Sequence, residues 1–245
     1  MSDRLPFVLR VTGTLLLLTA CAAVMTVVAT LTLFQCRRLY SRRLATPCGR
    51  LVLRLWGIRM LVHQDAPFPL RQTVFISNHT STADLFALVA LGLPNVRFFL
   101  SGYLRALVPL GIIGYLTGIF WTVPQIHPER RTRIFQRAER ILRRSGESVY
   151  LSPEGTRITT DAIGHFNKGA FHLATALHAP IVPIYILIPR AIDPGRGLHA
   201  RPGDMHVYIR APIETADWRI ADLEKNRSRM REFYVEWKRE LERRQ

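Results

Sequence analysis

The stretch Thr73–Leu85, with the sequence TVFISNHTSTADL, decides how the fold of this chain is interpreted. Its first half, Thr73–Ser77, is short, apolar and β-branched, which predicts a buried strand. The small polar residues that lead to Asp84 predict the start of a helix, because an apolar run follows them. Asn78 and His79 therefore stand at the carboxyl end of a strand, where open α/β sheets bind their ligands.

Asp84 lies five positions after His79, across the expected turn from strand to helix. A carboxylate on one ring nitrogen of a histidine fixes the tautomer and leaves the other nitrogen free to accept a proton. The chain has no serine or cysteine in an elbow motif, so we expect His79 to act as a general base on a substrate hydroxyl. The structural alternative is a helix cap at His79 and a favourable charge at the helix start at Asp84.

Short apolar runs recur along the chain and alternate with stretches of helical spacing. This alternation predicts an α/β fold, and we expect a seven-stranded mixed sheet flanked by helices. Pro183 suggests that its own strand has an edge or irregular position. The expected strands are Ile58–His63, Thr73–Ser77, Val96–Leu100, Ile119–Val123, Ser148–Leu151, Ile181–Ile188 and Met205–Arg210.

The segment Tyr103–Leu116 is strongly apolar, and we expect Pro109 and Gly111 to break it. It is interpreted either as a core helix or as part of a tunnel for an acyl chain. The other expected helices are Asp84–Leu91, Pro128–Arg144, Lys168–His178 and Leu223–Leu241.

The N-terminal region contains roughly 26 consecutive residues without a charge, Val11–Cys36. About 20 apolar residues suffice to cross a bilayer as a helix. The arginines that follow, Arg37, Arg38, Arg42 and Arg43, mark the cytoplasmic side by the positive-inside rule. A re-entrant or surface-lying helix pair is an alternative, because the next segment is basic and amphipathic.

We therefore expect residues 1–45 to anchor the chain and residues 46–245 to form one domain. The expected location is a bacterial inner membrane, with the domain facing the cytoplasm. A cleaved signal peptide is the rival interpretation, but the apolar run is too long for one. The sequence Leu18–Cys21 resembles a lipoprotein cleavage box, although the apolar run continues beyond it to Phe34.

The chain has 34 Lys and Arg against 18 Asp and Glu, a formal net charge of +16. Such an excess indicates an anionic partner, which can be a lipid surface, a phosphorylated substrate or nucleic acid. Nucleic acid is not expected, because the sequence carries no recognition motif for it. The basic stretches 130–144 and 227–244 are interpreted mostly as solvated helix faces. The three cysteines all precede residue 49 and show no metal spacing, so we expect no metal.

A second polar block, Ser152–Arg157 (SPEGTR), follows the expected strand Ser148–Leu151. Gly155 permits a tight turn, and the guanidinium of Arg157 matches the geometry of a phosphate. Glu154 can pair with Arg157 or accept a hydrogen bond from a substrate hydroxyl. Lys168 adds a possible anion contact. The structural alternative is an ordinary surface turn with an internal ion pair.

Together, Asn78-His79-x4-Asp84 and Pro153–Arg157 resemble the motifs of the 1-acyl-sn-glycerol-3-phosphate acyltransferase family. The segments Phe166–Ala170 and Ala179–Ile184 resemble its final motif, and the resemblance covers about Leu51–Pro212. Members of this family make phosphatidic acid from lysophosphatidic acid. The resemblance implies transfer of an acyl group from acyl-CoA or acyl carrier protein to a lysophospholipid, with no further cofactor.

By position, the resemblance assigns base catalysis to His79 and Asp84 and a structural role to Pro183. We expect the remaining site residues to bind substrate, and the PEGTR loop to bind the phosphate of the acceptor. These residues are Asn78, Glu154, Gly155, Thr156, Arg157 and Lys168.

One family motif departs from its usual pattern. The family shows a lysine and a glutamate before the apolar helix and an arginine on the next strand, but here the segments are Ser101–Leu104 and Phe120–Val123. Arg130 or Arg131 can replace the arginine from the next loop. The acceptor therefore stays open between lysophosphatidic acid, a lyso-aminolipid and another lipid alcohol. A non-catalytic lipid-binding membrane protein is the alternative to an enzyme.

Overall fold

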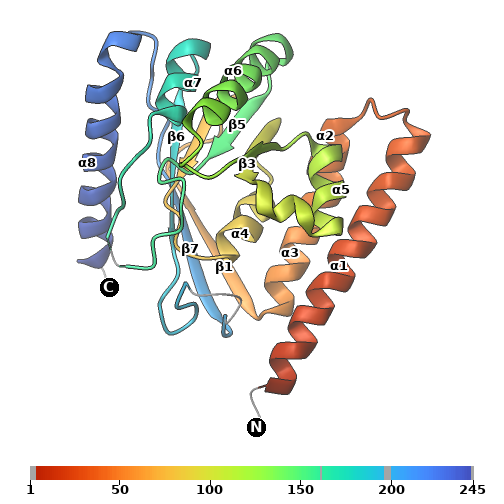
Figure 1. The fold of residues 1–245 in the computed structure, drawn as a ribbon. Coiled ribbons are helices and arrows are strands. Elements are labelled where there is room, and N and C mark those ends of the chain that lie inside the picture. The colour runs from red at the N-terminus through yellow and green to blue at the C-terminus, as the bar shows by residue number, and fades with distance from the viewer. Residues whose placement is uncertain (1–3, 161, 196–199, 244–245) are drawn as a thin grey trace.

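The structure is a computed structural model that describes residues 4–160, 162–195 and 200–243 (Figure 1). Seven strands form one sheet in the order β1-β7-β6-β2-β5-β3-β4. All neighbouring strands are parallel except β6 and β7, which confirms the expected mixed sheet. The strands are β1 (Ile58–Gln64), β2 (Val74–Ser77), β3 (Val96–Ser101), β4 (Phe120–Thr122), β5 (Ser148–Leu151), β6 (Ile181–Leu187) and β7 (Gly203–Ile209).

Helices cover both faces of this sheet (Figure 1). On one face α6, α7 and α8 pack over a core that includes Phe171 and Tyr234. On the other face α3 and α4 pack over a second core, and α1 packs against α3 and α5. The helices are α1 (Arg4–Leu31), α2 (Arg37–Leu39), α3 (Thr46–Leu55), α4 (Ala83–Leu91), α5 (Val108–Thr117), α6 (Pro128–Ser145), α7 (Gly169–Leu177) and α8 (Leu223–Glu242). Shorter helical segments are η1 (Tyr40–Ala45), η2 (Gly102–Ala106) and η3 (Ile220–Asp222).

Strand β2 lies near the centre of the sheet, between β6 and β5. Val74 and Ile76 face the core under α6 to α8, whereas Phe75 faces the opposite core. All three side chains are 0% exposed. A strand that is buried on both faces has a continuous apolar sequence, which is why the sequence predicts a strand here. Because β2 and β5 are parallel neighbours, the polar residues that follow them meet at one edge of the sheet.

The expectation of an edge position for Pro183 is wrong, because β6 lies between β7 and β2. The pairing beside Pro183 is nevertheless irregular. The β6–β7 ladder ends at the pair Ile184–Ile209, and the carbonyl of Pro183 accepts from the amide of Arg210 beyond that end. Proline is tolerated here because its missing amide proton falls where the regular ladder has already stopped.

The apolar segment after β3 divides at Leu107, before Pro109 rather than at it. Pro109 stands in the first turn of α5, where a missing amide proton breaks no helical hydrogen bond. Gly111 lies inside the helix, and a β-carbon there would come within 2.7 Å of the carbonyl oxygen of Arg105. The expected break is therefore displaced, because proline initiates this helix instead of ending it.

Helix α1 is the one helix in the described residues that is long and apolar enough to cross a membrane, over Pro6–Leu31. It does not extend away from the domain, because it packs along α3 and α5 (Figure 1). The indole of Trp56 donates a hydrogen bond of 2.8 Å to Thr14, and the Trp56 ring lies edge-on to Phe7. The division into an anchor and a domain at residue 45 stays a prediction.

Candidate active site

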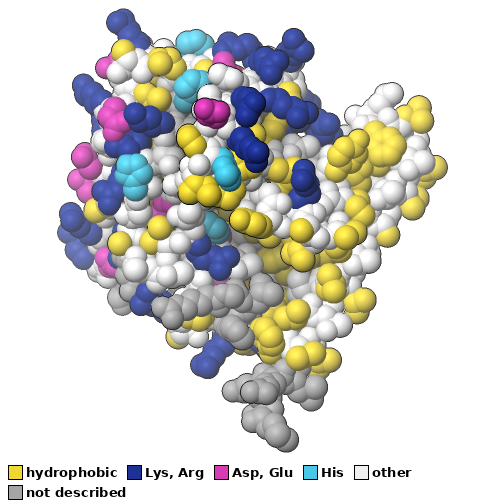
Figure 2. Space-filling model, in the orientation of Figure 1, with side chains coloured by type: hydrophobic (Ala, Val, Ile, Leu, Met, Phe, Trp, Pro, Cys, Tyr) yellow, Lys and Arg dark blue, Asp and Glu magenta, His cyan; other side chains and the backbone are white. Residues whose placement is uncertain are grey.

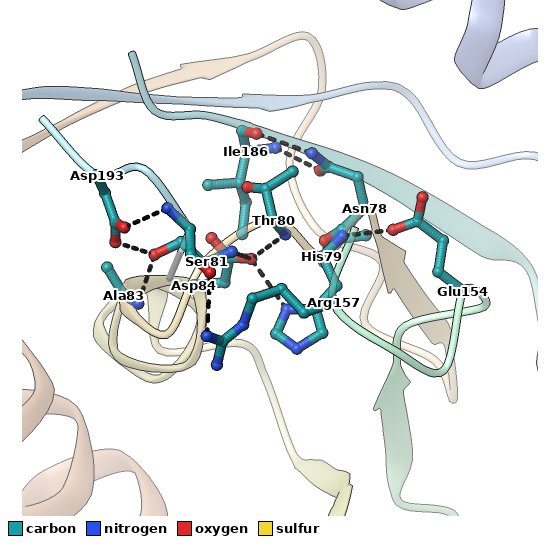
Figure 3. A network of polar contacts seen from close by, with 12 residues as sticks. Asn78, His79, Thr80, Ser81, Ala83, Asp84, Glu154, Arg157, Ile186 and Asp193 are labelled. Carbon is teal, nitrogen blue, oxygen red and sulfur yellow. Dashed lines mark hydrogen bonds and ion pairs between the residues drawn. The ribbon is translucent and has the colours of Figure 1, made fainter. Parts of the chain in front are cut away.

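The turn between β2 and α4 holds the imidazole of His79 against the carboxylate of Asp84 (Figure 3). The distance from His79 Nδ1 to Asp84 Oδ2 is 3.0 Å. The same oxygen accepts the backbone amides of Thr80 at 2.7 Å and Ser81 at 2.9 Å. These amides fix the carboxylate in place, so the sequence-based prediction that it folds back onto the ring agrees with the geometry.

A carboxylate only accepts hydrogen bonds, so the proton of a neutral His79 ring is assigned to Nδ1. The other nitrogen, Nε2, then carries a lone pair. The side chain of His79 is 31% exposed, whereas that of Asp84 is 1% exposed. A substrate can therefore reach the ring but not the carboxylate, which is the arrangement that general-base chemistry requires.

The two polar blocks meet through Glu154. Its Oε2 accepts the backbone amide of His79 at 2.7 Å, and its Oε1 accepts that of Gly164 at 2.8 Å. The amide of Ile158 donates to the carbonyl of His79 at 2.8 Å, which closes the junction on its other side. Burial raises the pKa of Glu154 above its ordinary value, although these two amides and His79 act in the opposite direction.

This geometry differs from the ion pair that we considered for Glu154. Within the described residues Glu154 and Arg157 form no ion pair, because both carboxylate oxygens face backbone amides. Glu154 is 3% exposed, so it acts as an internal brace between the loop and the histidine backbone. Its expected contact with substrate stays untested.

Arg157 lies near the same junction, and one guanidinium nitrogen donates to the carbonyl of Gly195 at 3.2 Å. Its Nε is buried and has no partner among the described residues. Gly155 and Thr156 are exposed beside it. Gly155 has a φ of +69°, a left-handed conformation that favours glycine. A β-carbon there would lie 2.9 Å from the side-chain nitrogen Nδ2 of Asn167.

Two other predicted site residues have structural partners. The side-chain amide of Asn78 bonds both backbone groups of Ile186 on β6, at 2.8 and 2.9 Å, and Asn78 is 1% exposed. Lys168 pairs with Glu224 of α8 at 2.9 Å. Asn78 thus ties the end of β2 to β6, whereas Lys168 is directed to a surface carboxylate.

Arg131 is one of the two candidate replacements for the missing strand arginine. Its guanidinium donates at 3.0 Å to the carbonyl of Val123, just beyond the end of β4. Burial lowers its pKa below the ordinary arginine value. Arg130, the other candidate replacement, is exposed. Of the two, Arg131 is therefore the one held at the carboxyl end of β4.

Sequence reasoning missed three groups that support this site. Ser81 and Asp193 form a buried hydrogen bond, and Asp193 also accepts the amide of Gly195. Arg231 of α8 donates to the carbonyls of Ile163 and Gly164, so part of the basic C-terminal helix is not a solvated face. Asp193-Pro194-Gly195 is a recognisable turn signal, but nothing in the sequence indicates that it faces Ser81.

An apolar cavity lies beside the site, between α4, β3, α5 and the N-terminal helices. Leu85 and Phe86, which follow Asp84 directly, contribute to its wall together with Phe98 and Ile113. The polar edge of the sheet thus adjoins an apolar space. In the described residues, no group of three or more His, Cys, Asp or Glu side chains is arranged to hold a metal ion.

A family model described as acyltransferase matches residues 59–187. A chloroplast 1-acyl-sn-glycerol-3-phosphate acyltransferase from Brassica napus is 31% identical over 160 residues, covering 64% of this chain and 44% of that protein. The human 1-acyl-sn-glycerol-3-phosphate acyltransferase beta is 34% identical over 114 residues, covering 46% and 41%. The chain thus spans less than half the length of these relatives.

The crystal structure of the 1-acyl-sn-glycerophosphate acyltransferase PlsC from Thermotoga maritima superposes with a TM-score of 0.66. It is 19% identical and covers 91% of this chain and 96% of its own, so the two share a fold. The family model spans more than half of the chain, and both polar blocks, from Asn78 to Asp84 and from Pro153 to Arg157, fall inside it. This chain therefore belongs to the acyltransferase family.

Proposed function

We propose that the protein transfers a fatty acyl group from a thioester, acyl-CoA or acyl carrier protein, to the hydroxyl of a lysophospholipid. The observation that carries this proposal is the His79–Asp84 pair, buried on the carboxylate side and accessible on the imidazole side. Two chloroplast relatives named as 1-acyl-sn-glycerol-3-phosphate acyltransferases support lysophosphatidic acid as the acceptor. A lyso-aminolipid is the alternative acceptor, because the family's strand arginine is absent.

In the proposed reaction, Nε2 of His79 accepts the proton of the acceptor hydroxyl as its oxygen attacks the thioester carbonyl. The new carbon–oxygen bond forms, the tetrahedral intermediate collapses, and the carbon–sulfur bond breaks. The departing thiolate takes the proton back from His79, so the enzyme returns to its starting state. The carboxylate of Asp84 stabilises the imidazolium that exists between these two proton transfers. A thioester is already activated, so no covalent enzyme intermediate is needed.

We assign the acceptor phosphate to Arg157. One nitrogen of its guanidinium donates to the carbonyl of Gly195, and its buried Nε has no hydrogen-bond partner within the described residues. A planar fork of donors matches a phosphate better than an ammonium does. Exposed Gly155 and Thr156 stand beside it, and Lys168, paired with Glu224, has a peripheral role.

The apolar cavity next to α4 is the proposed site for the acyl chain. Its wall begins at Leu85, one residue after Asp84, so a chain that enters it leaves the thioester close to His79. The cavity is also lined by Trp121, Leu110 and Ile113. An apolar space beside a polar, reactive edge suits an amphiphilic substrate.

The apolar surface of α1 and α5 is the proposed membrane contact. Exposed apolar side chains lie on both helices, with Leu16 65% and Val108 69% exposed, and they gather over α1 in Figure 2. Because α1 packs along α3 and α5, it can enter a bilayer only together with these neighbours. We therefore favour insertion from one side over a single crossing. Arg37 and Arg38 support the cytoplasmic side of a bacterial inner membrane.

A labelled acyl thioester, offered with a panel of lysolipids in mixed micelles, tests this proposal. The expected result is a diacyl product of the correct mass and stoichiometric release of free thiol. Lipid binding without thiol release across the whole panel would instead identify a non-catalytic lipid-binding protein and overturn the proposal.

A further inference from the structure

The segment that follows β6, Pro189–Gly195, reaches back to both polar blocks of the site. It lies beyond residue 187, the last residue that the family model matches. Its principal side chain is Asp193, which is 6% exposed. In Figure 3 the carboxylate of Asp193 lies beside Ser81, at the start of α4. A buried carboxylate needs compensating donors, and here one comes from the turn before α4 and the other from the segment itself.

The first donor is the hydroxyl of Ser81, which is hydrogen-bonded to Asp193 Oδ2. Ser81 also accepts the amide of Ala83 through its hydroxyl oxygen at 2.9 Å, and its own amide donates to Asp84 at 2.9 Å. Ser81 is therefore one of the residues that fix the catalytic carboxylate. Through Ser81, Asp193 supports the turn that orients the imidazole of His79.

The second donor is the amide of Gly195, which donates to Asp193 Oδ1 at 2.7 Å. This bond sets the direction of the Gly195 peptide, whose carbonyl accepts from Arg157 at 3.2 Å. Gly195 has a φ of +75°, and a β-carbon there would come within 2.6 Å of the carbonyl oxygen of Thr80. The segment therefore packs directly on the turn that carries His79.

We propose that Asp193 is a positioning residue that holds two groups in register: the His79–Asp84 turn through Ser81, and the Arg157 guanidinium through Gly195. This inference rests on the proposed function. The short glycerol backbone limits the distance between the attacking hydroxyl and the phosphate of one acceptor molecule. The base and the phosphate-binding arginine must therefore keep a fixed separation, and small displacements of positioned groups cost up to ~10²-fold in rate.

Asp193 forms two hydrogen bonds, which we call the Ser81 arm and the Gly195 arm, and substitutions can separate their effects. Asp193→Asn keeps an oxygen for the amide of Gly195 but removes the charge, and its NH₂ group can only donate to the Ser81 oxygen, which also accepts from Ala83. It therefore weakens the Ser81 arm and keeps the Gly195 arm, whereas Ser81→Ala removes the Ser81 arm alone. Asp193→Ala loses both arms. Asp204→Ala, which breaks an exposed pair with Arg59 on the β1–β7 edge, is the matched control.

The experiment measures kcat and KM of each purified variant with lysophosphatidic acid and with a monoacylglycerol, which lacks the phosphate. Ser81→Ala is expected to lower kcat for both acceptors about tenfold with a normal KM, since it loses one buried hydrogen bond, and Asp193→Asn is expected to change kcat in the same direction by a smaller factor. Asp193→Ala is expected to add about a tenfold rise in KM for lysophosphatidic acid only. The double variant Ser81→Ala, Asp193→Ala should be no worse than Asp193→Ala.

An unchanged KM for lysophosphatidic acid in Asp193→Ala overturns the inference, as does a double variant whose losses multiply. A reduced kcat with equal KM values in all variants indicates a merely structural role and also overturns it. A wild-type protein that transfers no acyl group defeats the proposed function instead. In that case the ratio of binding affinities for the two lipids, measured by tryptophan fluorescence, still decides whether Asp193 orients Arg157.

Discussion

The two ends of the parallel strands hold buried carboxylates in opposite ways. We call them the amino edge and the carboxyl edge of the sheet. At the amino edge, Glu147 precedes β5 and pairs with Arg97 of β3, whose Nε donates to it at 2.7 Å; Arg37 lies 3.9 Å from the same carboxylate. At the carboxyl edge, backbone amides rather than arginines hold Asp84 and Glu154. Both arrangements hold buried carboxylates in place, but only the second does so without engaging an arginine.

This difference separates a structural cluster from a reactive one. At the amino edge, the charge of Glu147 is neutralised directly, and burial and the neighbouring Arg97 lower the pKa of Arg37. At the carboxyl edge, amides orient Asp84 without cancelling its charge, so the carboxylate still acts on the imidazole of His79. We therefore expect substitutions at the carboxyl edge to change rates and substitutions at the amino edge to change stability.

The largest expected effect is that of Asp84→Asn. The side-chain oxygen of asparagine can take the place of Asp84 Oδ2 and accept from Thr80, Ser81 and His79, but the negative charge that stabilises the imidazolium is lost. We expect kcat to fall by ~10²–10⁴-fold while the thermal unfolding midpoint changes little. Steady-state kinetics and circular dichroism on the same preparation measure both. A variant with near-normal kcat would show that the carboxylate is not needed by the base.

The converse effect is expected for Glu147→Ala. This variant leaves Arg97, which is 8% exposed, with a buried and unpaired charge. Breaking a buried pair from one side typically costs about 3–5 kcal/mol of unfolding free energy. Denaturant titration measures this loss, and kcat per folded molecule should stay normal. Loss of activity without loss of stability would contradict the separation of the two edges.

An intermediate effect is expected for Arg157→Lys. The charge is retained but the fork of donors is lost, so KM for lysophosphatidic acid should rise about tenfold while KM for the thioester is unchanged. Arg229→Lys, on an exposed position of α8, provides the control. Equal KM values for the phosphorylated acceptor in all three proteins would remove Arg157 from acceptor binding.

The smallest expected effect is a pH dependence of stability due to Glu154. Because burial raises its pKa in the native state, the folded protein keeps a proton that the unfolded chain has already lost. The free energy of unfolding should therefore decrease as pH rises from the ordinary glutamate pKa towards the raised value. Glu154→Gln should flatten this slope, as unfolding titrations at several pH values would reveal. A steeper slope in Glu154→Gln would reverse the assignment.

The sequence was informative where a residue's role depends on its neighbours in the chain. The apolar runs predicted all seven strands, and the spacing of His79 and Asp84 predicted their contact, because both fall within one turn. The contacts of Glu154 with His79 and of Asp193 with Ser81 join residues that lie 75 and 112 positions apart, so no local pattern indicates them. The same limit explains Arg231, which resembles a solvated helical arginine until the fold brings loop carbonyls to it.

The most direct test of the central claim, that one imidazole removes the proton from the acceptor, is acyl transfer by His79→Ala. The account predicts a loss of ~10²–10⁴-fold in kcat with normal folding, because base catalysis contributes about that much. His63→Ala, on the edge strand β1, which β7 and β6 separate from β2, should keep full activity. A fully active His79→Ala protein would contradict the account.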